Sequence, residues 1–581
     1  MTKLTNNYLI RKVFNSYLFM SILSVLAATI GMLVDGIVIG QFLGPECISS
    51  FGLSSPVLIL VAALAGIFSN GGASCCSSHI GRGEAEKVRL NFTVTCVATV
   101  LAGAVVTAVG VFGCETIAVL LGARGELVGL TADYIRGIGL GGIAILLSQV
   151  IMIYVRTDND SALGFVSVLF MTASNIAMDI VFATVFKWGM FGMGLATSIS
   201  YLVCLLVCLL HFRRKNNLLK LTKIRGGLAE FWDVFKTGIP SALNRGCMTV
   251  RGIILNRLLM VLAGSIAVSA LAVQNNVNNI LSSMTMGVGM TVMLMAGIFY
   301  GERDALAIEK TLRISLRTGI IMSAVVSGLV IVFAKPVVGL FLRSGAEGSA
   351  LAVRSLRMFC MSLPFSMVCV VMINFYQCTR NLFMANFICI CHGLLFVVAY
   401  SLALSPLLST DGVWISFLLS EITTIALCLT VVFFRNKKRL KRFADIMLLP
   451  ENFEPDGNRT LNLSLKDDMQ QVMLLSEKVS GFCKKFIDDE DRINRLSLSI
   501  EEMAGNIVSH GFKDGREHFI DIKIIVGQDE IILRMRDNGV AFNPLQYDAD
   551  EEHYGIAMIR GMAKDFQYKN AIGMNNLTVV L

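Results

Sequence analysis

The sequence has few charged side chains and few histidines for a chain of 581 residues. Only 16% of its residues are Asp, Glu, Lys or Arg and six are histidines, whereas 55% are hydrophobic and the mean hydropathy is +0.68. This shortage of charge excludes an ordinary soluble protein. The composition indicates an integral membrane protein that is long enough to hold more than one domain.

Several short motifs are also missing. There is no Cys-x-x-Cys spacing and the histidines are scattered, so the sequence does not predict a zinc site. The fifteen cysteines lie almost all in apolar runs such as "SCCSS" (74–78), which is typical of small apolar residues in helices. No Walker A motif occurs, so an ABC-type motor is not predicted. The first apolar run continues into "VDGIVIGQFLG" without a cleavage site, so we do not interpret it as a signal peptide.

The charge that is present divides the chain into two parts. Residues 1–449 carry 35 Lys and Arg against 19 Asp and Glu, whereas residues 450–581 carry 15 against 23. The basic residues of the first part are spread over short segments between apolar runs, which is typical of loops that orient membrane helices. We therefore expect a basic membrane part joined to an acidic soluble tail, and no nucleic-acid partner.

Twelve apolar runs are long enough to cross a bilayer, since a spanning helix needs about 20 apolar residues. The N-terminus, the even-numbered loops and the segment after the last span hold most of the Lys and Arg, for example in "RNKKRLKR". Because basic loops stay on the cytoplasmic side, we expect both termini in the cytoplasm and the spans in the lipid bilayer of the plasma membrane. The predicted spans are 13–40, 52–78, 92–113, 131–155, 161–186, 189–211, 238–262, 266–297, 314–340, 350–377, 381–406 and 412–434.

An internal repeat supports the even number of spans. The loop after the second span, "GRGEAEKVRL", is similar to the loop after the eighth, "YGERDALAIEKTL", and the two lie at equivalent places in two six-span halves. Such halves are typical of transporters, with a substrate site between them near the midplane. We expect helix bundles at 1–225 and 226–435, a basic cytoplasmic linker at 436–457 and a soluble domain at 458–581.

Motifs in the membrane part resemble one transporter family. They are "LVDGIVIGQFLGPECISSFGLSSP" (33–56), "SNIAMDIVF" (174–182), the following "GMFGMGLATSISY" and the later "GIPSAL". In this order they look like the multidrug and toxic compound extrusion (MATE) family. The resemblance implies two bundles of six helices that open alternately to the two sides of the membrane and export small organic solutes or drugs in exchange for H⁺ or Na⁺.

Ionisable residues inside the spans need a partner or a function, since each costs roughly 3 kcal/mol to insert. Asp35 lies in the first span and Asp179 in the fifth, four residues after Asn175 and so on the same helix face. The family has acidic and amide groups at these motif positions, which makes the three residues candidates for cation coupling. A structural hydrogen-bond network between helices is the alternative.

Polar residues also interrupt the seventh and eighth spans. "QNNVNN" (274–279) covers more than a helical turn, so the eighth span either lines a wet cavity or is locally broken. Asn275 and Asn279 share a face and are candidates for lining a substrate site, with interhelical hydrogen bonding as the alternative. Arg251 in the seventh span either pairs with a carboxylate such as Glu421 or binds an anionic group of the substrate.

After residue 450 the pattern changes to the amphipathic segments of a small soluble domain. We predict an α/β sandwich from strands at "TLNLSL", "FIDIKIIV", "EIILRMRD", 566–570 and 576–581 and helices at 467–487, 491–510 and 555–564. The predicted fold class is thus an all-α polytopic membrane protein with two six-helix bundles and a C-terminal α/β sandwich.

Three segments of the tail follow one another in a meaningful order. "EEMAGNIVSHG" places Glu502 and Asn506 four residues apart on one helix face, "RDNGVAFNP" offers Asp537 and Gly539 after a strand, and "YGIAMIRGMA" begins a helix with Gly555. Together they resemble the N, G1 and G2 boxes of the histidine-kinase-like ATPases, and most closely the anti-sigma-factor serine kinases. The resemblance implies Mg-ATP as the cofactor.

The same resemblance assigns roles to these residues. Asn506 would hold Mg²⁺ through its amide oxygen, Glu502 would act as a general base, and Asp537 would accept a hydrogen bond from the adenine amino group. Gly539 would allow a close backbone approach, and Gly555 would begin the helix whose N-terminus faces phosphate.

Thr578 resembles the threonine that the family has near adenine. The sequence departs from the family pattern at Ala557, where a second glycine is expected, and in the acidic loop "LQYDADEEHY", which has no glycine run. His510 belongs to the N-box helix, so a complete sensor histidine kinase is disfavoured.

We expect the tail to regulate the exporter or to signal, either by phosphorylating a serine on a small cytoplasmic protein or by gating transport when ATP binds. Two other functions stay open for the whole chain. One is a receptor-kinase whose spans sense a ligand without transporting it, and the other is a flippase for a lipid-linked oligosaccharide.

Overall fold

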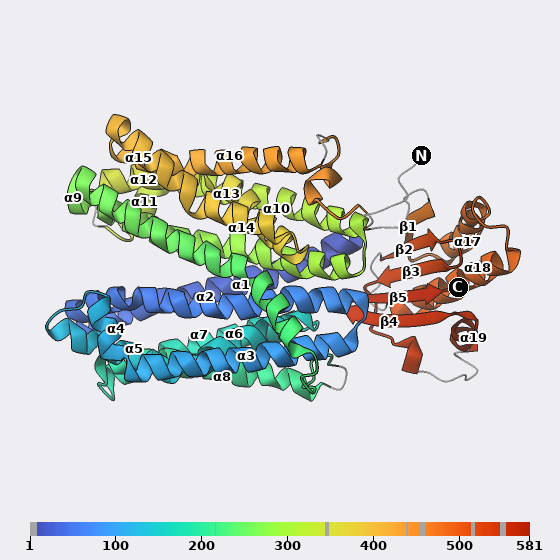
Figure 1. The fold of residues 1–581 in the computed structure, drawn as a ribbon, viewed down its shortest axis with the longest axis horizontal. Helices are drawn as coiled ribbons and strands as arrows, with labels where there is room; N and C mark the ends of the chain where they lie inside the picture. Colours follow the sequence, from blue (N-terminus) through green and yellow to red (C-terminus); the bar gives the residue numbers. More distant parts are fainter. Residues whose placement is uncertain are drawn as a thin grey trace. The chain divides into compact units, whose positions relative to one another are not determined.

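The computed structural model describes residues 8–214, 217–342, 348–436, 440–451, 453, 459–512, 518–546 and 554–581 (Figure 1). The chain folds into two compact units. The larger comprises Tyr17–Gly301 and Leu312–Leu448, and the smaller comprises Met1–Ser16, Glu302–Thr311 and Leu449–Leu581. The segment Glu302–Thr311 therefore belongs to the unit that contains the C-terminal domain, which the sequence did not predict.

The first half of the membrane part is helical from Tyr8 to Arg213, with short breaks at glycines and caps. Its helices lie together in Figure 1, where they run from blue to teal. They are α1 (Tyr8–Val38) with the π-helical η1 (Ile39–Leu43), α2 (Pro45–Arg82), α3 (Ala85–Phe112), α4 (Cys114–Leu120), α5 (Glu126–Leu140), α6 (Gly142–Thr157), α7 (Ser161–Thr184), α8 (Gly189–Leu209) and η2 (Leu210–Arg213).

The second half begins with α9 (Gly227–Gly301), which is broken where Gly264 adopts a φ of +64°. Only glycine takes this left-handed conformation readily, so the chain turns between two spans at this residue. The remaining helices are α10 (Ala305–Val332), α11 (Ala334–Gly339), α12 (Ser349–Cys360), α13 (Leu363–Cys378), α14 (Leu382–Ile390) with the π-helical η3 (Cys391–Leu395), α15 (Phe396–Leu408) and α16 (Thr410–Arg435).

The helices agree with the predicted spans. Among the described residues, nine helices are long and apolar enough to cross a membrane, and two bent pairs, Glu126–Leu140 with Gly142–Thr157 and Ser349–Cys360 with Leu363–Cys378, bring the number to eleven. The break in α9 divides it into two of the predicted spans, which gives twelve. The helix is continuous through 274–279, so the idea of a local break at "QNNVNN" is wrong.

The C-terminal domain is an antiparallel five-stranded sheet with the order β1-β2-β3-β5-β4, covered by helices on one face. Its short helical turns are η6 (Ile507–Gly511) and η7 (Pro544–Gln546), whereas η4 (Phe443–Met447) belongs to the larger unit. All five predicted strands and three predicted helices are confirmed. They are β1 (Thr460–Lys466), α17 (Met469–Cys483), α18 (Glu490–Asn506), β2 (Phe519–Val526), β3 (Ile531–Asp537), α19 (Tyr554–Met562), β4 (Asp565–Ala571) and β5 (Met574–Val580).

Alternation along the strands builds the core of this domain. Every second residue of β2, β3 and β5 points toward the helices and joins one apolar cluster, whereas the residues between them point to the other face. Asp468 and Asp489 cap α17 and α18 by accepting hydrogen bonds from backbone N–H groups. The residues that face the helices include Ile520, Ile522, Ile524, Leu533, Met535, Leu577 and Val579.

Candidate functional sites

The three candidate coupling residues lie together in the first bundle. Asn175 and Asp179 on α7 are joined by a hydrogen bond of 3.2 Å from the amide Nδ2 to the carboxylate Oδ2. Asp35 on α1 lies close enough to Asp179 for the two carboxyl groups to interact electrostatically. All three side chains are buried, and Oδ1 of each aspartate has no hydrogen-bond partner among the described residues.

Two neighbouring buried carboxyl groups cannot both carry a full charge at low cost. They either share a proton or surround a cation, and carboxylate and amide oxygens are the ligands that a hard cation such as Na⁺ prefers. The unpartnered oxygens are therefore the atoms to which a proton or Na⁺ would bind. Whether the cluster couples transport stays a prediction.

The asparagine candidates of the second bundle are exposed. Asn275 and Asn279 lie on the second part of α9 with their side chains open, whereas the neighbouring Gln274 is buried and accepts a hydrogen bond of 2.5 Å from Ser355. Exposed amides in a membrane span are costly against lipid and are favourable along a wet cavity. Their place is therefore compatible with the predicted substrate-lining role.

The expected ion pair between Arg251 and Glu421 is not formed among the described residues. Glu421 on α16 instead contacts His392 in η3, at 2.7 Å from Nδ1 to Oε1, and Cys369 of α13 lies beside them. The guanidinium of Arg251 lies over the ring of Phe417, 5.3 Å from its centroid. The predicted pairing of Arg251 with Glu421 is thus wrong, because the Glu421 carboxylate pairs with the imidazole of His392.

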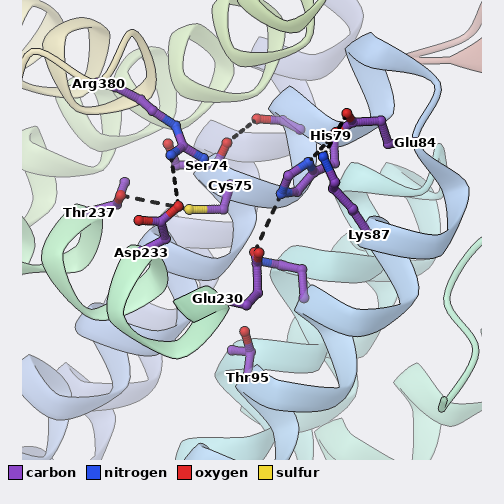
Figure 2. Close-up of polar contacts among 12 residues, drawn as sticks. Ser74, Cys75, His79, Glu84, Lys87, Thr95, Glu230, Asp233, Thr237 and Arg380 are labelled. Atoms are coloured by element: carbon purple, nitrogen blue, oxygen red, sulfur yellow. Dashed lines mark hydrogen bonds and ion pairs between the residues drawn. The ribbon is translucent and has the colours of Figure 1, made fainter. Parts of the chain in front are cut away.

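A polar network joins α2, α3 and the start of α9 (Figure 2). The imidazole of His79 is 2.8 Å from Glu84 through Nδ1 and 3.4 Å from Glu230 through Nε2. Nearby, Arg380 donates a hydrogen bond of 3.2 Å to Asp233. The network connects the first half of the chain with the second at the end of the bundles where α2 ends.

Glycines allow the same helices to pack backbone against backbone. A Cβ added to Gly238 on α9 would stand 2.1 Å from the carbonyl oxygen of Ile67 on α2, and one added to Gly71 on α2 would stand 2.2 Å from that of Val234. Real Cβ atoms essentially never approach so closely. The two bundles are therefore closed against each other at this end.

In the C-terminal domain, the N-box residues lie beside the G2 glycine. Asn506 donates a hydrogen bond of 3.4 Å to Glu502 Oε1, one helical turn before it on α18. A Cβ added to Gly555, at the start of α19, would stand 1.9 Å from the same oxygen. Glycine at this position thus leaves the space in which the Glu502 carboxylate lies.

The G1 residues are held by backbone and amide groups. Asp537 Oδ1 accepts hydrogen bonds from the backbone N–H of Gly539 at 2.7 Å and from Asn575 Nδ2 at 2.8 Å. Burial raises the pKa of the Asp537 carboxyl, and the hydrogen bonds from Asn575 and Gly539 oppose that shift. A Cβ on Gly539 would stand 2.4 Å from the carbonyl oxygen of Gly511, so the G1 turn packs on the end of the N-box helix.

The structure does not bring Thr578 to Asp537. Leu577 and Val579 point into the core, so Thr578 between them faces the opposite side of the sheet, where its register partner is Arg534. Asn575 occupies the place beside Asp537, and sequence reasoning missed it because the register of the last strand was unknown. Most of the acidic loop "LQYDADEEHY" lies outside the described residues, and Ala557 lies within α19.

These residues fit a Mg-nucleotide in their chemistry. The Glu502 carboxylate, which accepts a hydrogen bond from Asn506, lies against Gly555 at the start of α19, and the buried carboxylate of Asp537 has its two described hydrogen bonds on a single oxygen. Helix N-termini favour phosphate, and Mg²⁺ prefers oxygen ligands. The set therefore supplies groups for a metal, for phosphates and for a base.

Comparisons with protein families match both parts of the chain. The MatE family model matches residues 21–181 and 240–401, together more than half of the chain. The model of the histidine kinase-like ATPase domain matches residues 465–581.

Curated relatives are multidrug export proteins named MepA. That of Staphylococcus saprophyticus is 25% identical over 309 residues, which cover 52% of this chain and 68% of the relative. That of Staphylococcus aureus strain RF122 is 24% identical over 242 residues, covering 40% of this chain and 53% of the relative. The matched part thus spans about half to two thirds of these relatives.

Solved structures share the membrane fold. An outward-facing multidrug resistance MATE family transporter of the MOP superfamily superimposes with a TM-score of 0.69 at 20% identity, covering 72% of this chain and 94% of that structure. A MOP superfamily transporter from Pyrococcus furiosus, which is described as having a binding pocket of reversed polarity, gives a TM-score of 0.67 at 21% identity with the same coverages.

Proposed function

Because the chain belongs to the MatE family and carries a histidine kinase-like ATPase domain, we propose that it exports small organic solutes in exchange for H⁺ or Na⁺, and that the domain regulates this transport. The observation that carries the proposal is the buried cluster of Asp35, Asn175 and Asp179 with its unpartnered carboxylate oxygens. The two MepA relatives, which are named as multidrug exporters, support the same class of cargo.

The coupling of cation binding to conformation follows from the change in the charge of the cluster when a cation binds. When the cluster binds a proton or Na⁺, its negative charge is neutralised and the cost of burying it falls, which favours the conformation in which Asp35 and Asp179 are closed off. Loss of the cation restores the charge and favours hydration of the cluster. A cation gradient can therefore drive the bundles from one opening to the other.

Transport by purified protein in liposomes tests this mechanism. We expect efflux of a fluorescent organic cation under an imposed pH or Na⁺ gradient, and loss of that efflux in Asp179→Asn. The control is Asp133→Asn, which changes a carboxylate on α5 that is 46% exposed and pairs with Arg136 on the surface. Equal activity of wild type and Asp179→Asn would contradict the proposal, and the absence of any counterflow would favour a receptor that does not transport.

We infer that the domain binds Mg-ATP on the cytoplasmic side. Asn506 would hold the metal, the start of α19 at Gly555 the phosphates, and Asp537 with Gly539 the adenine; Mg-ATP, when bound, supplies a phosphoryl group for transfer. Asn575 orients Asp537 by a hydrogen bond on Oδ1, which leaves Oδ2 to accept from the adenine amino group. Glu502 lies one helical turn from Asn506 and would take a proton from water or from a serine hydroxyl.

Adjacent carboxylates on α18 offer a matched test. Glu501 is exposed, whereas Glu502 faces Asn506 and Gly555. On the full-length protein we expect Asn506→Ala to abolish binding of Mg-ATP, and Glu502→Gln to keep binding but lose phosphoryl transfer to water or to a cytosolic protein. Glu501→Gln should keep both. If Glu502→Gln and Glu501→Gln behave alike, Glu502 is not the base.

A further inference from the structure

The two halves of the membrane part have equivalent loops after their second helices. In the first half, α2 ends at Arg82, Gly83 takes a φ of +76°, and Glu84 precedes α3. In the second half, α9 ends at Gly301, and the residues before α10 are Glu302, Arg303 with a φ of +54°, and Asp304. Counting back from the helix starts, Arg82 corresponds to Glu302 and Glu84 to Asp304.

The first-half loop is satisfied within its own bundle. Glu84 lies 2.8 Å from His79 and 2.8 Å from Lys87. Burial opposes the charge of Glu84, but these hydrogen bonds hold its pKa below the ordinary value. Arg82 is exposed. The described partners of the Glu84 carboxylate thus both belong to the first half.

The second-half loop makes different contacts. We call Glu302–Asp304 the strap, since it belongs to the same compact unit as the C-terminal domain. Asp304 lies 3.2 Å from Lys523 Nζ on β2 and 2.7 Å from Arg536 Nη1 on β3. Glu302 accepts hydrogen bonds from Arg536 and from Asn576 on β5. Both carboxylates are more than nine-tenths buried, at 8% exposure for Glu302 and 3% for Asp304.

These partners lie on the face of the sheet that α17–α19 do not cover. Lys523 alternates with the core residues of β2, and Arg536 with those of β3. Cationic side chains buried without partners would cost several kcal/mol each. The strap carboxylates neutralise them, so the sequence of this face and that of the strap are matched in charge. Burial of Asp304 would raise its pKa, but the nearby cations Arg536 and Lys523 keep that pKa well below the ordinary value.

The strap and the candidate nucleotide site use neighbouring residues of the same two strands. On β3, Arg536 binds the strap and the next residue, Asp537, belongs to the site. On β5, Asn576 binds the strap and Asn575 holds Asp537. The pairs Arg536 with Asn576 and Asp537 with Asn575 are in register. A shift of β3 or β5 that moves the strap-binding residues on one face of the sheet therefore also moves the nucleotide-site residues on the other face.

We propose that the strap is a permanent docking segment for the open face of the ATPase-like domain, and that it couples the nucleotide site to the exporter through the chain that continues into α9 and α10. The coupling rests on the nucleotide binding proposed above, whereas the docking does not. The strap has the acidic Glu302 where the first-half loop has Arg82. A domain added to one half of a repeated transporter requires such an acidic residue to pair with the cations on its open face.

The docking is tested by hydrogen exchange on the full-length protein without nucleotide. We expect Glu302→Gln with Asp304→Asn to raise exchange in 302–311 about tenfold or more, because the neutral amides no longer compensate the cations. Arg303→Gln, an exposed change in the same loop, is the control. Unchanged exchange in 302–311 would overturn the docking.

The variant is a valid test only if the domain stays folded, which continued protection of α18 reports. If α18 loses protection too, Glu302→Gln alone is judged. It keeps the ion pairs of Asp304 and should give a smaller rise in exchange, and no rise would overturn the docking.

The coupling is tested on the same variants. We expect Mg-ATP to change gradient-driven efflux by the wild type, and this effect to vanish in the double variant while its affinity for Mg-ATP stays within about threefold. Persistence of the ATP effect in the double variant would overturn the coupling. If the wild type binds no Mg-ATP, the proposed nucleotide site fails and the coupling with it, while the exchange result still decides the docking.

Discussion

Substitution of Gly238 by alanine should open the bundles at the end where α2 and α9 meet. The new methyl group would stand 2.1 Å from the carbonyl oxygen of Ile67 and 2.7 Å from the carbon of that carbonyl. These are backbone atoms, so no side-chain rotation relieves the clash and the two helices must separate by about 1 Å. Overpacking of this kind costs about 1–3 kcal/mol, which shifts the equilibrium toward the open form by about 5- to 150-fold.

Cys75 reports this opening. Its side chain is fully buried at the same contact, with its thiol 3.7 Å from Thr237 Oγ1. Alkylation of a buried thiol proceeds through the open fraction, so the rate of Cys75 alkylation, followed by peptide mass spectrometry, should rise with that fraction. Cys75→Ser identifies the modified residue, since Cys76 is its neighbour.

A second glycine on α9 provides the control for this experiment. Gly252 lies on the same helix and has no atom of the described residues within 4 Å of an added Cβ, so Gly252→Ala adds the same methyl group without a clash. If Gly238→Ala alkylates no faster than Gly252→Ala, the α2–α9 contact is not the closure between the bundles.

Three further results are expected. His392→Ala should leave Glu421 as a buried carboxylate without its 2.7 Å partner, lowering the free energy of unfolding by about 3–5 kcal/mol in thermal denaturation, whereas His392→Gln, which can still donate a hydrogen bond, should lose less; equal losses would contradict the pairing. The affinity for Mg-ATP should fall on acidification at a pH that is still above the ordinary titration range of aspartate, because the pKa of Asp537 is raised. Since the folded state favours the protonated form of Asp537, the contribution of this residue to stability is lost as the pH rises through its raised pKa. Asn575→Ala should weaken binding at neutral pH, and binding that is independent of pH in calorimetric titrations would exclude Asp537 from the adenine contact.

Much of the fold could be read from the sequence because its signals are local. Runs of about 20 apolar residues have few alternatives to a spanning helix, and the alternation in "FIDIKIIV" and "EIILRMRD" defines two strands of a half-buried sheet. Asn175 and Asp179 were predicted on one face because helix periodicity is fixed, and their hydrogen bond follows. The loop pair of the repeat was equally visible as sequence similarity.

The remainder depends on contacts between distant residues. Arg536 and Glu302 are 234 residues apart, and nothing local in either segment indicates the other. Glu421 pairs with His392, which lies in the π-helical turn η3 29 residues away along the chain, and not with Arg251. Thr578 was assigned without knowing the strand register, and one residue of register moves a side chain to the other face.

The central claim is that a cation gradient, and not ATP, drives export through the cluster around Asp179. The most direct test is cation movement in proteoliposomes that contain no nucleotide. When no cation gradient is present at the start, an outward substrate gradient should drive H⁺ or Na⁺ inward. Asp179→Asn should abolish this movement. Substrate flux without cation movement, or transport that requires hydrolysable ATP, would contradict the account.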